Sequence, residues 1–470
     1  MIHSHRFTLD QFAPISIYEK LKKLFPNEIS FLLESAGNSN GNYTIIALGA
    51  RERLTYSEGV THYTDSKETK CVIPQSPFDF LKRYYRTCDR DYFRAQSKEL
   101  EVGYVDGFMG YIGYDTVKVF EPTLNSSMSN LEDQTQIPDM DLILPKLVVV
   151  VSHKHSTITL ITTLSTYHEQ FTAIEKELKS TYHYTPLISI TNDQGGDFIY
   201  SKSQFFDMVD RSKEMIKSGD VFQILMTNRY IRNAIVDPFS FYRVLRIKNP
   251  SPYMYLMEYG NFSIVGSSPE VMVKLDDGDI LLRPIAGTRK RGIDKQRDLE
   301  LEEELLSDPK ELAEHLMLID LGRNDVGRVA KTGTVRVEEM MHVERYSHVM
   351  HIVSDVHAKL REDKDMFDLL AATFTAGTMT GAPKIRAMEL IAQYEGVKRS
   401  FYSGTIGYFG FDGNMDTAIT IRTALIKPDK IILQAGAGIV ADSVHELEYI
   451  EVTNKLGALM NTLDDLTLSQ

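Results

Sequence analysis

The chain has 470 residues, of which 43% are hydrophobic, so it can bury a large core and its length predicts two or three structural units. A net charge of −13 disfavours nucleic acid as a partner. Two cysteines, Cys71 and Cys88, are too few for a disulfide framework, and the first residues lack an apolar signal region. We therefore expect a cytoplasmic protein.

The N-terminal part of the chain mixes short strand-like runs with helical segments. The run 43–49 and the apolar stretch 142–151 predict strands, and the second is too short to cross a bilayer, so we expect no membrane partner. Polar loop composition at 191–197 indicates a boundary near 195. The predicted domains are an N-terminal region over 1–195 and a second domain over 196–470.

Helical and strand patterns alternate beyond this boundary. Apolar residues from Phe205 to Ile216 recur at helical spacing and predict an amphipathic helix that ends at Ser218-Gly219, before a strand over 221–230. A meander of three strands follows later, joined by Phe-Asp-Gly-Asn and Lys-Pro-Asp-Lys turns, at 402–409, 416–426 and 431–436. Helices and antiparallel hairpins in this order predict an α+β fold.

The middle strand of the meander carries a single arginine. If 416–426 is one continuous strand, Ile419, Ile421 and Leu425 share one face, and Arg422 lies on the other face among small residues. An arginine with space above it can bind an anion. A strand with one solvent-facing arginine is the alternative explanation.

One predicted helix begins with a pair of glutamates. Asp308 and Pro309 match the N-cap and the first helical position, and Glu311 and Glu314 then share a face. The opposite, core-facing side is predicted to comprise Leu312, Leu316 and Ile319.

A second predicted helix repeats this arrangement. Ser443 and Glu446 form a capping-box pattern at its start, and Glu448 and Glu451 share a face. The apolar side is predicted to comprise Leu447, Ile450 and Leu459.

Four carboxylates in one pocket repel each other unless a divalent cation lies among them. Mg²⁺ takes oxygen ligands and keeps several waters, so such a site can receive a small anionic substrate. The two pairs therefore predict a Mg²⁺ site. In the alternative, Glu311 only caps its helix, and Glu451 pairs with Lys455 at ordinary helix spacing.

Three glycine-containing segments accompany the two helices, at 284–292, 375–391 and 435–440. Each offers backbone N–H groups that a carboxylate can approach, and none matches a Walker or dinucleotide-binding motif. His351, on an apolar strand, is the candidate acid–base residue of this region, and a structural histidine is the alternative.

Five segments together resemble the chorismate-utilising enzymes, and among them the anthranilate synthase group: PIAGTRKRG, DPKELAEHLMLIDLGRNDVGRV, AGTMTGAPKIRAMELI, YSGTIGYFGFDGNMDTAITIRT and AGAGIVADSVHELEYIEVTNK. The resemblance is strong from roughly 200 to 465 and weaker before. It implies the family's fold, in which large antiparallel β-sheets pack together with helices outside. The N-terminal region is then interwoven with the chorismate-binding domain and carries the feedback elements.

The resemblance also implies an activity and a set of site residues. The activity is the conversion of chorismate and ammonia to anthranilate and pyruvate, the first step of tryptophan biosynthesis. Glu314 and Glu451 would ligate Mg²⁺, with Glu311 and Glu448 supporting them through water, and the metal would hold the ring carboxylate. The implied catalytic residues are His351, which assists departure of the C4 hydroxyl, Gln223 and Thr378. The implied substrate-binding residues are Gly287, Thr288, Tyr402, Arg422, Gly436, Ala437, Gly438 and Lys455.

Two positions separate groups within the family. Gln223 stands where relatives that add water to chorismate carry a lysine, which favours amination. Ala286 stands where aminodeoxychorismate synthases often carry a nucleophilic lysine, which favours direct amination at C2 and pyruvate elimination. The alternatives are aminodeoxychorismate synthase component I of the folate pathway and a non-catalytic tryptophan-binding regulator.

Two further segments, FLLES at 31–35 and NPSPYMYLM at 249–257, resemble the family's tryptophan-feedback site. They imply that L-tryptophan inhibits the chain by binding Ser35, Pro252, Tyr253 and Met254, and ordinary β-rich core is the alternative. Neither cysteine lies in a glycine-rich nucleophile elbow. The implied partner is therefore a glutamine amidotransferase subunit, component II, which supplies ammonia within a heterotetramer.

Overall fold

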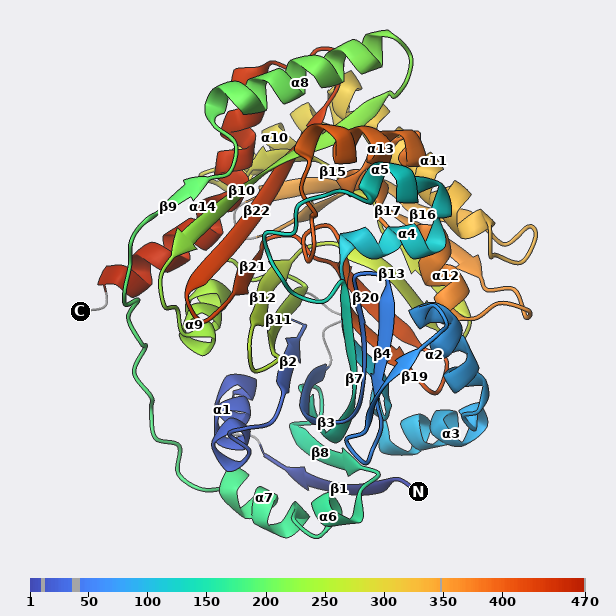
Figure 1. Ribbon diagram of the computed structural model, residues 1–470, viewed down its shortest axis with the longest axis vertical. Coiled ribbons are helices and arrows are strands. Elements are labelled where there is room, and N and C mark those ends of the chain that lie inside the picture. The colour runs from blue at the N-terminus through green and yellow to red at the C-terminus, as the bar shows by residue number, and fades with distance from the viewer. Residues whose placement is uncertain (10–12, 36–42, 347–348, 469–470) are drawn as a thin grey trace.

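The computed structural model describes residues 1–9, 13–35, 43–346 and 349–468. The fold is α+β, as predicted, because the paired strands of the described residues run antiparallel and form one connected set, with helices around it (Figure 1). None of the helices in these ranges is both long and apolar enough to cross a bilayer.

The strands follow one another along the whole chain. They are β1 His3–Thr8, β2 Ser30–Glu34, β3 Tyr43–Ser57, β4 Val60–Thr64, β5 Lys70–Ile73, β6 Gly107–Ile112, β7 Met140–Ser152, β8 Thr157–Thr162, β9 Gly196–Phe198, β10 Gln223–Asn233, β11 Tyr253–Glu258, β12 Ser263–Ser268, β13 Val271–Asp276, β14 Asp279–Leu282, β15 Ile285–Lys290, β16 Arg336–Arg345, β17 Val349–Lys359, β18 Gly381–Ala382, β19 Thr405–Gly410, β20 Met415–Ile419, β21 Thr423–Ile426 and β22 Lys430–Ile439.

The helices lie outside these strands. They are α1 Pro14–Leu24, α2 Pro77–Arg86, α3 Arg90–Leu100, α4 Val117–Phe120, α5 Asn125–Met128, α6 Ser165–His168, α7 Phe171–Leu178, α8 Lys202–Lys217, α9 Pro238–Lys248, α10 Lys295–Ser307, α11 Pro309–Gly327, α12 Met366–Thr373, α13 Lys384–Glu395 and α14 His445–Leu468. Figure 1 shows α8, α13 and α11 over the end of the sheet where β10 begins and β22 ends. It shows α1, α6 and α7 at the opposite end.

Strands from the two ends of the sequence alternate in space. β22 pairs with β10 and β21, β21 with β12, β12 with β11, and β11 with β2, which pairs in turn with β3. β6 likewise pairs with β19. Two large hydrophobic clusters lie against this surface, and each contains residues from both ends of the chain. Residues distant in sequence can therefore meet in one site.

Several predicted elements are confirmed. The helix predicted after residue 202 is α8, capped by Ser201, with Phe205, Met208 and Val209 buried. The apolar stretch 142–151 lies within the buried strand β7. The Phe-Asp-Gly-Asn turn joins β19 and β20 as an antiparallel hairpin.

The predicted start of α14 is wrong. The Ser443 hydroxyl accepts a hydrogen bond from the Val440 N–H at 3.1 Å and so closes a turn before the helix, which begins at His445. The predicted apolar side is also wrong, since Leu447 and Ile450 are 62% and 52% exposed. Nine positions separate Ile450 from the buried Leu459, which puts them on opposite sides of a helix. The buried face comprises Val452, Leu456, Leu459, Leu463 and Leu466.

The core face of α11 also differs from the prediction at one position. Leu316 is 44% exposed, whereas Leu318 and Ile319 are buried. Its neighbour His315 takes the inward position, where its Nε2 lies 2.7 Å from the Ser354 Oγ on β17. This contact joins the helix that carries Glu314 to the strand that carries His351.

Candidate functional site

The first acidic pair lies on α11, which begins where the sequence predicts. The Asp308 side chain caps the helix by accepting the N–H groups of Lys310 and Glu311 at 3.0 and 3.4 Å. The Glu311 carboxylate accepts the Arg289 Nη1 of β15 at 3.0 Å. One turn later, the Gln223 Nε2 of β10 donates to the Glu314 Oε1 at 3.3 Å. Glu311 is thus already paired with the Arg289 guanidinium, whereas among the described residues Glu314 has only a neutral amide partner within hydrogen-bonding distance.

The second acidic pair, on α14, faces the first. Burial raises the pKa of Glu314, and the negative charges of Glu311 and Glu451 add to this rise. Burial likewise raises the pKa of Glu448, with a further contribution from Glu451, while Lys310 opposes the rise at Glu448 and at Glu314. Glu451 is half-exposed and forms an ion pair with Lys455 at 2.6 Å. The carboxylates of the two helices therefore repel each other across the site.

The residue types and charges of this cluster fit a hard divalent cation. Carboxylate oxygens are suitable ligands, and the mutual repulsion that raises the pKa of Glu314 is what a cation would relieve. The Gln223 Oε1 is also buried without a hydrogen-bond partner. Among the described residues, however, no group of three or more acidic, histidine or cysteine side chains is arranged closely enough to hold an ion. Glu451 would have to exchange its Lys455 partner for the metal.

His351 lies on β17, opposite β15. Its Nδ1 lies 2.8 Å from the Gly287 carbonyl oxygen and 3.1 Å from the Thr288 Oγ1. Because a carbonyl can only accept, Nδ1 carries the proton and Nε2 keeps its lone pair. Burial lowers the pKa of His351 to about 4, so the ring is neutral at pH 7.

Gly287 brings His351 close to the acidic helix. It has φ +63°, a conformation that favours glycine, and a Cβ there would lie 3.1 Å from the Glu311 Oε2. The histidine, Thr288 and Glu311 therefore lie close together.

Sequence reasoning missed Glu270, which is 7% exposed between β12 and β13. The Thr378 Oγ1 donates to the Glu270 Oε1 at 3.0 Å. Burial raises the pKa of Glu270 to about 7, and the Thr378 hydrogen bond and the charges of Arg422 and Lys455 partly oppose this rise. The sequence did offer a signal for this residue, because Glu270 is an acidic residue between two largely apolar strand-like runs. Carboxylates are seldom buried without a partner or a function.

Arg422 lies in a break in the meander, so the prediction of one continuous strand over 416–426 is wrong. β20 ends at Ile419 and β21 begins at Thr423, and Arg422 between them has φ +49°. The Ile421 N–H donates to the Ile419 carbonyl, two residues back, at 2.9 Å, so the chain turns here instead of continuing the ladder. The guanidinium of Arg422 has no hydrogen-bond partner within the part of the chain that the structure describes.

Arg422 lies among the other candidate residues. Burial lowers the pKa of Arg422, whereas the negative charge of Glu270 opposes this change. The positive charge of Arg422 in turn contributes to the low pKa of His351. A half-buried guanidinium beside a histidine and a carboxyl group, with no partner among the described residues, is suited to an anionic ligand.

β10 and β22 bring the remaining predicted residues to the same place. Gly436 lies opposite Thr227 and Gly438 opposite Leu225, and the Lys455 Nζ donates to the Gly436 carbonyl at 3.0 Å. A Cβ on Gly438 would lie 2.7 Å from the Gln223 Nε2. Burial raises the pKa of Tyr402, and a backbone hydrogen bond from Gly436 partly opposes this rise. The predicted glycine segment at 435–440 therefore lies against both Gln223 and Tyr402.

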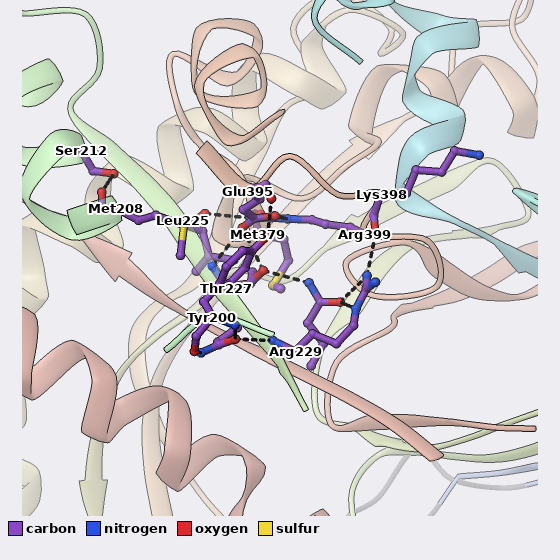
Figure 2. A network of polar contacts seen from close by, with 12 residues as sticks. Tyr200, Met208, Ser212, Leu225, Thr227, Arg229, Met379, Glu395, Lys398 and Arg399 are labelled. Carbon is purple, nitrogen blue, oxygen red and sulfur yellow. Dashed lines mark hydrogen bonds and ion pairs between the residues drawn. The ribbon is translucent and has the colours of Figure 1, made fainter. Parts of the chain in front are cut away.

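A buried ion pair holds these segments together from behind. Figure 2 shows the Arg399 guanidinium between β10 and the segment at Met379, where it donates to the Leu225 and Met379 carbonyls at 2.8 and 2.7 Å. The same guanidinium donates twice to Glu395, whose Oε1 accepts the Thr227 N–H at 2.9 Å. Arg399 thus links the segments that carry Gln223, Thr378 and Tyr402. Removing one partner of such a buried pair typically costs about 3–5 kcal/mol.

The predicted tryptophan-binding residues lie in a separate, large pocket of about 1030 Å³. β2 and β11 pair with Glu34 opposite Met254, so the two segments at 31–35 and 249–257 are adjacent. Ser35, Pro252, Tyr253 and Met254 all line this pocket, and within the described residues none of the predicted catalytic, substrate-binding or metal-ligating residues does.

Comparisons with known proteins agree with one another. The model of the chorismate binding enzyme family matches residues 30–461. Anthranilate synthase component 1 of Aquifex aeolicus is 40% identical over 98% of this chain and 94% of its own length, and that of Pseudomonas aeruginosa is 42% identical over 96% and 93%. The crystal structure of anthranilate synthase component I from Streptococcus pneumoniae superposes with a TM-score of 0.77 and 34% identity, covering 90% of this chain and 93% of that one.

Proposed function

Because the chain belongs to the chorismate binding enzyme family, among relatives named anthranilate synthase component 1, we propose that it converts chorismate and ammonia to anthranilate and pyruvate. The convergence of Glu270, His351 and Arg422 beside two acidic helices carries the proposal. It supplies a proton donor, a neutral imidazole and an anion-binding guanidinium within one buried site.

Two features support the binding of a dicarboxylate. The Arg422 guanidinium can take the enolpyruvyl carboxylate in a bidentate pair. Glu314 and Glu451, supported by Glu311 and Glu448, would hold Mg²⁺, which supplies positive charge for the ring carboxylate. Tyr402, Lys455, Thr288 and the backbone of Gly287 and Gly436–Gly438 line the space between these two anchors in this proposal.

The amination step delivers one proton to the leaving hydroxyl, and the ammonium group that forms at C2 releases one proton in turn. Ammonia attacks C2 with its own lone pair, so the neutral Gln223 amide only has to orient it. The C4 hydroxyl leaves as water and requires a proton. Glu270, with a pKa of about 7, can give that proton, whereas His351, with a pKa of about 4, is unprotonated at pH 7. His351 then offers Nε2 beside the leaving group as a neutral hydrogen-bond partner.

Pyruvate elimination follows amination in this proposal. The C2–H proton is removed and the C3–O bond breaks, so that the ring becomes aromatic, and the departing enolpyruvate takes up one proton to become pyruvate. Ala286 on β15 provides no nucleophile that could divert the reaction. The rival activity is formation of aminodeoxychorismate, in which the amino group replaces the C4 hydroxyl and the enolpyruvyl group is kept, so that no pyruvate is released at this stage.

We expect the chain by itself to form anthranilate with ammonium salts but not with glutamine. Below pH about 7, the rate at fixed total ammonium should rise with pH, because NH₃ is the nucleophile. Above that pH, ionisation of Glu270 offsets the gain. Anthranilate fluorescence and released pyruvate, measured together in the same sample, check this expectation. Aminodeoxychorismate or isochorismate as the main product would reject the assignment.

A glutamine amidotransferase subunit is the partner in this proposal, because the relatives are named as component 1. The heterotetramer and a cytoplasmic location belong to the same proposal, and both described cysteines are free, as in a reducing compartment. Addition of the amidotransferase subunit should restore glutamine-dependent turnover.

L-Tryptophan is the proposed occupant of the large pocket. Ser35→Arg places a long charged side chain beside Tyr253 and Met254, so we expect the tryptophan concentration that halves activity to rise at least tenfold. Inhibition curves measured with ammonia as substrate, each scaled to the tryptophan-free rate of the same variant, check this. Retention of wild-type sensitivity in Ser35→Arg, or no heat of tryptophan binding in calorimetry, would reject the assignment.

A further inference from the structure

The large pocket and the catalytic cluster share a neighbour, Tyr346, which follows β16. Tyr346 lines the pocket together with Glu344 and Arg283. Its ring also packs edge-on against the His351 imidazole, with ring centroids 5.5 Å apart and an interplanar angle of 63°. One side chain therefore contacts both the pocket and a predicted catalytic residue.

Three hydrogen bonds fix Tyr346 in this position. Its hydroxyl donates to the Glu344 Oε2 at 2.8 Å, and its N–H donates to the Val349 carbonyl at 2.8 Å. The Arg291 Nη1 donates to the Tyr346 carbonyl at 2.7 Å. Glu344 lies on β16 directly opposite His351 on β17. The Tyr346 side chain therefore contacts both residues of this cross-strand pair.

Polar contacts continue from Tyr346 toward the predicted tryptophan-binding residues. Arg283 forms an ion pair with Glu344 at 2.8 Å and donates to Asp355 at 2.7 Å. The positive charge of Arg283 also acts on Tyr253, where it opposes the burial that raises the tyrosine pKa. Arg283, Glu344 and Tyr346 thus form a connected series along the wall of the pocket that Tyr253 also lines, and the series ends at His351.

Tyr346 also interacts electrostatically with Arg422, the proposed anion-binding residue of the cluster. Burial lowers the pKa of Arg422, and the Tyr346 hydroxyl is among the groups that oppose this change. A displacement of Tyr346 would therefore alter the surroundings of both His351 and Arg422.

We propose that Tyr346 is a positioning residue for His351 and that an occupant of the large pocket lowers turnover by changing the position of this ring through Arg283 and Glu344. The inference rests on the proposed function, with L-tryptophan as the occupant. A ligand shifts an equilibrium only if it binds the two arrangements unequally, and chorismate must weaken tryptophan binding by the same factor.

Tyr346→Phe removes the hydrogen bond to Glu344 and keeps the ring. We expect tryptophan to bind this variant with a Kd within about threefold of wild type, measured by calorimetry. Activity remaining at saturating tryptophan should be at least tenfold higher than in wild type. Tyr346→Leu, which also removes the ring, should in addition lower kcat with ammonia by about tenfold, with a smaller change in KM, because small misplacements of catalytic groups are costly.

Tyr43→Phe is the matched control. Tyr43 lines the same pocket and donates its hydroxyl to the Glu101 carbonyl at 2.9 Å, but the structure gives it no contact with His351. We expect this variant to keep full inhibition at saturating tryptophan. Thermal unfolding of each variant verifies that it is folded.

Full inhibition of Tyr346→Phe at saturating tryptophan would overturn the inference. Loss of tryptophan binding in that variant would also overturn it, because Tyr346 would then be a ligand contact. If tryptophan fails to inhibit the wild type, both the tryptophan assignment and this inference fail. Anthranilate formation by the same wild-type sample would still support the proposed activity, so the two failures are distinguishable.

Discussion

Glu314→Ala is expected to lower kcat/KM for chorismate by more than about 100-fold, since loss of even an outer-shell partner of a metal typically costs 10–100-fold. Glu314 is half-buried beside Glu311 and Glu451, and within the described ranges its carboxylate bonds only to the neutral Gln223 amide. Replacing it removes a proposed Mg²⁺ ligand from the most enclosed part of the cluster. Glu451→Ala should have a similar effect from the facing helix.

Mg²⁺ binding gives a readout independent of turnover. Calorimetric titration of metal-stripped protein with Mg²⁺ should give a heat of binding in the wild type that is lost in both variants. Asp320→Ala and Glu446→Ala are matched controls on the same helices, because their side chains are 63% and 52% exposed and pair only with Arg323 and His445. Full turnover by EDTA-treated protein, or unchanged Mg²⁺ binding by both active-site variants, would contradict the metal assignment.

The sequence predicted those parts of the fold in which local signals and tertiary packing agree. Asp308-Pro309 gave the start of α11, and the Phe-Asp-Gly-Asn turn gave the β19–β20 hairpin. At Ser443, the hydroxyl that matches a capping box instead closes the preceding turn. Leu447 and Ile450 were assigned to the core because they are apolar, but the buried face of α14 is fixed by its contacts with the sheet, which periodicity over so few residues cannot reveal.

The candidate site was predicted in part by its motifs, and the remaining features depend on contacts distant in sequence. At the break, the Arg422 carbonyl accepts the Ser267 N–H of the distant strand β12 at 3.2 Å, so alternation along 416–426 could not predict it. Glu270 has no recognisable spacing to Thr378, which is more than one hundred residues away, and its environment becomes evident only in the fold. The same holds for Tyr346, which lines the large pocket and also packs against His351.

Glu270→Gln is expected to lower kcat with ammonia by about 10²–10⁴-fold, the usual contribution of a general acid. Glutamine keeps the shape and can still accept the Thr378 hydroxyl, but it cannot deliver a proton to the leaving hydroxyl. The wild-type pH profile carries a second expectation. Glu270 acts in its protonated form and has a pKa of about 7, so activity should be present below that pH and lost above it.

The profile is measured as kcat/KM for chorismate at constant NH₃, with total ammonium adjusted at each pH so that the nucleophile does not vary. Wild type should lose about tenfold per pH unit well above pH 7, and this loss should be absent from the residual activity of Glu270→Gln. Asp115→Asn is the matched control: Asp115 is another buried carboxyl group, with a pKa raised by burial to about 6, whose Oδ2 accepts the Ser400 N–H at 2.7 Å. That variant should keep the alkaline loss. An alkaline loss that persists in Glu270→Gln would assign the proton to another group, because no titration of residue 270 could then produce it.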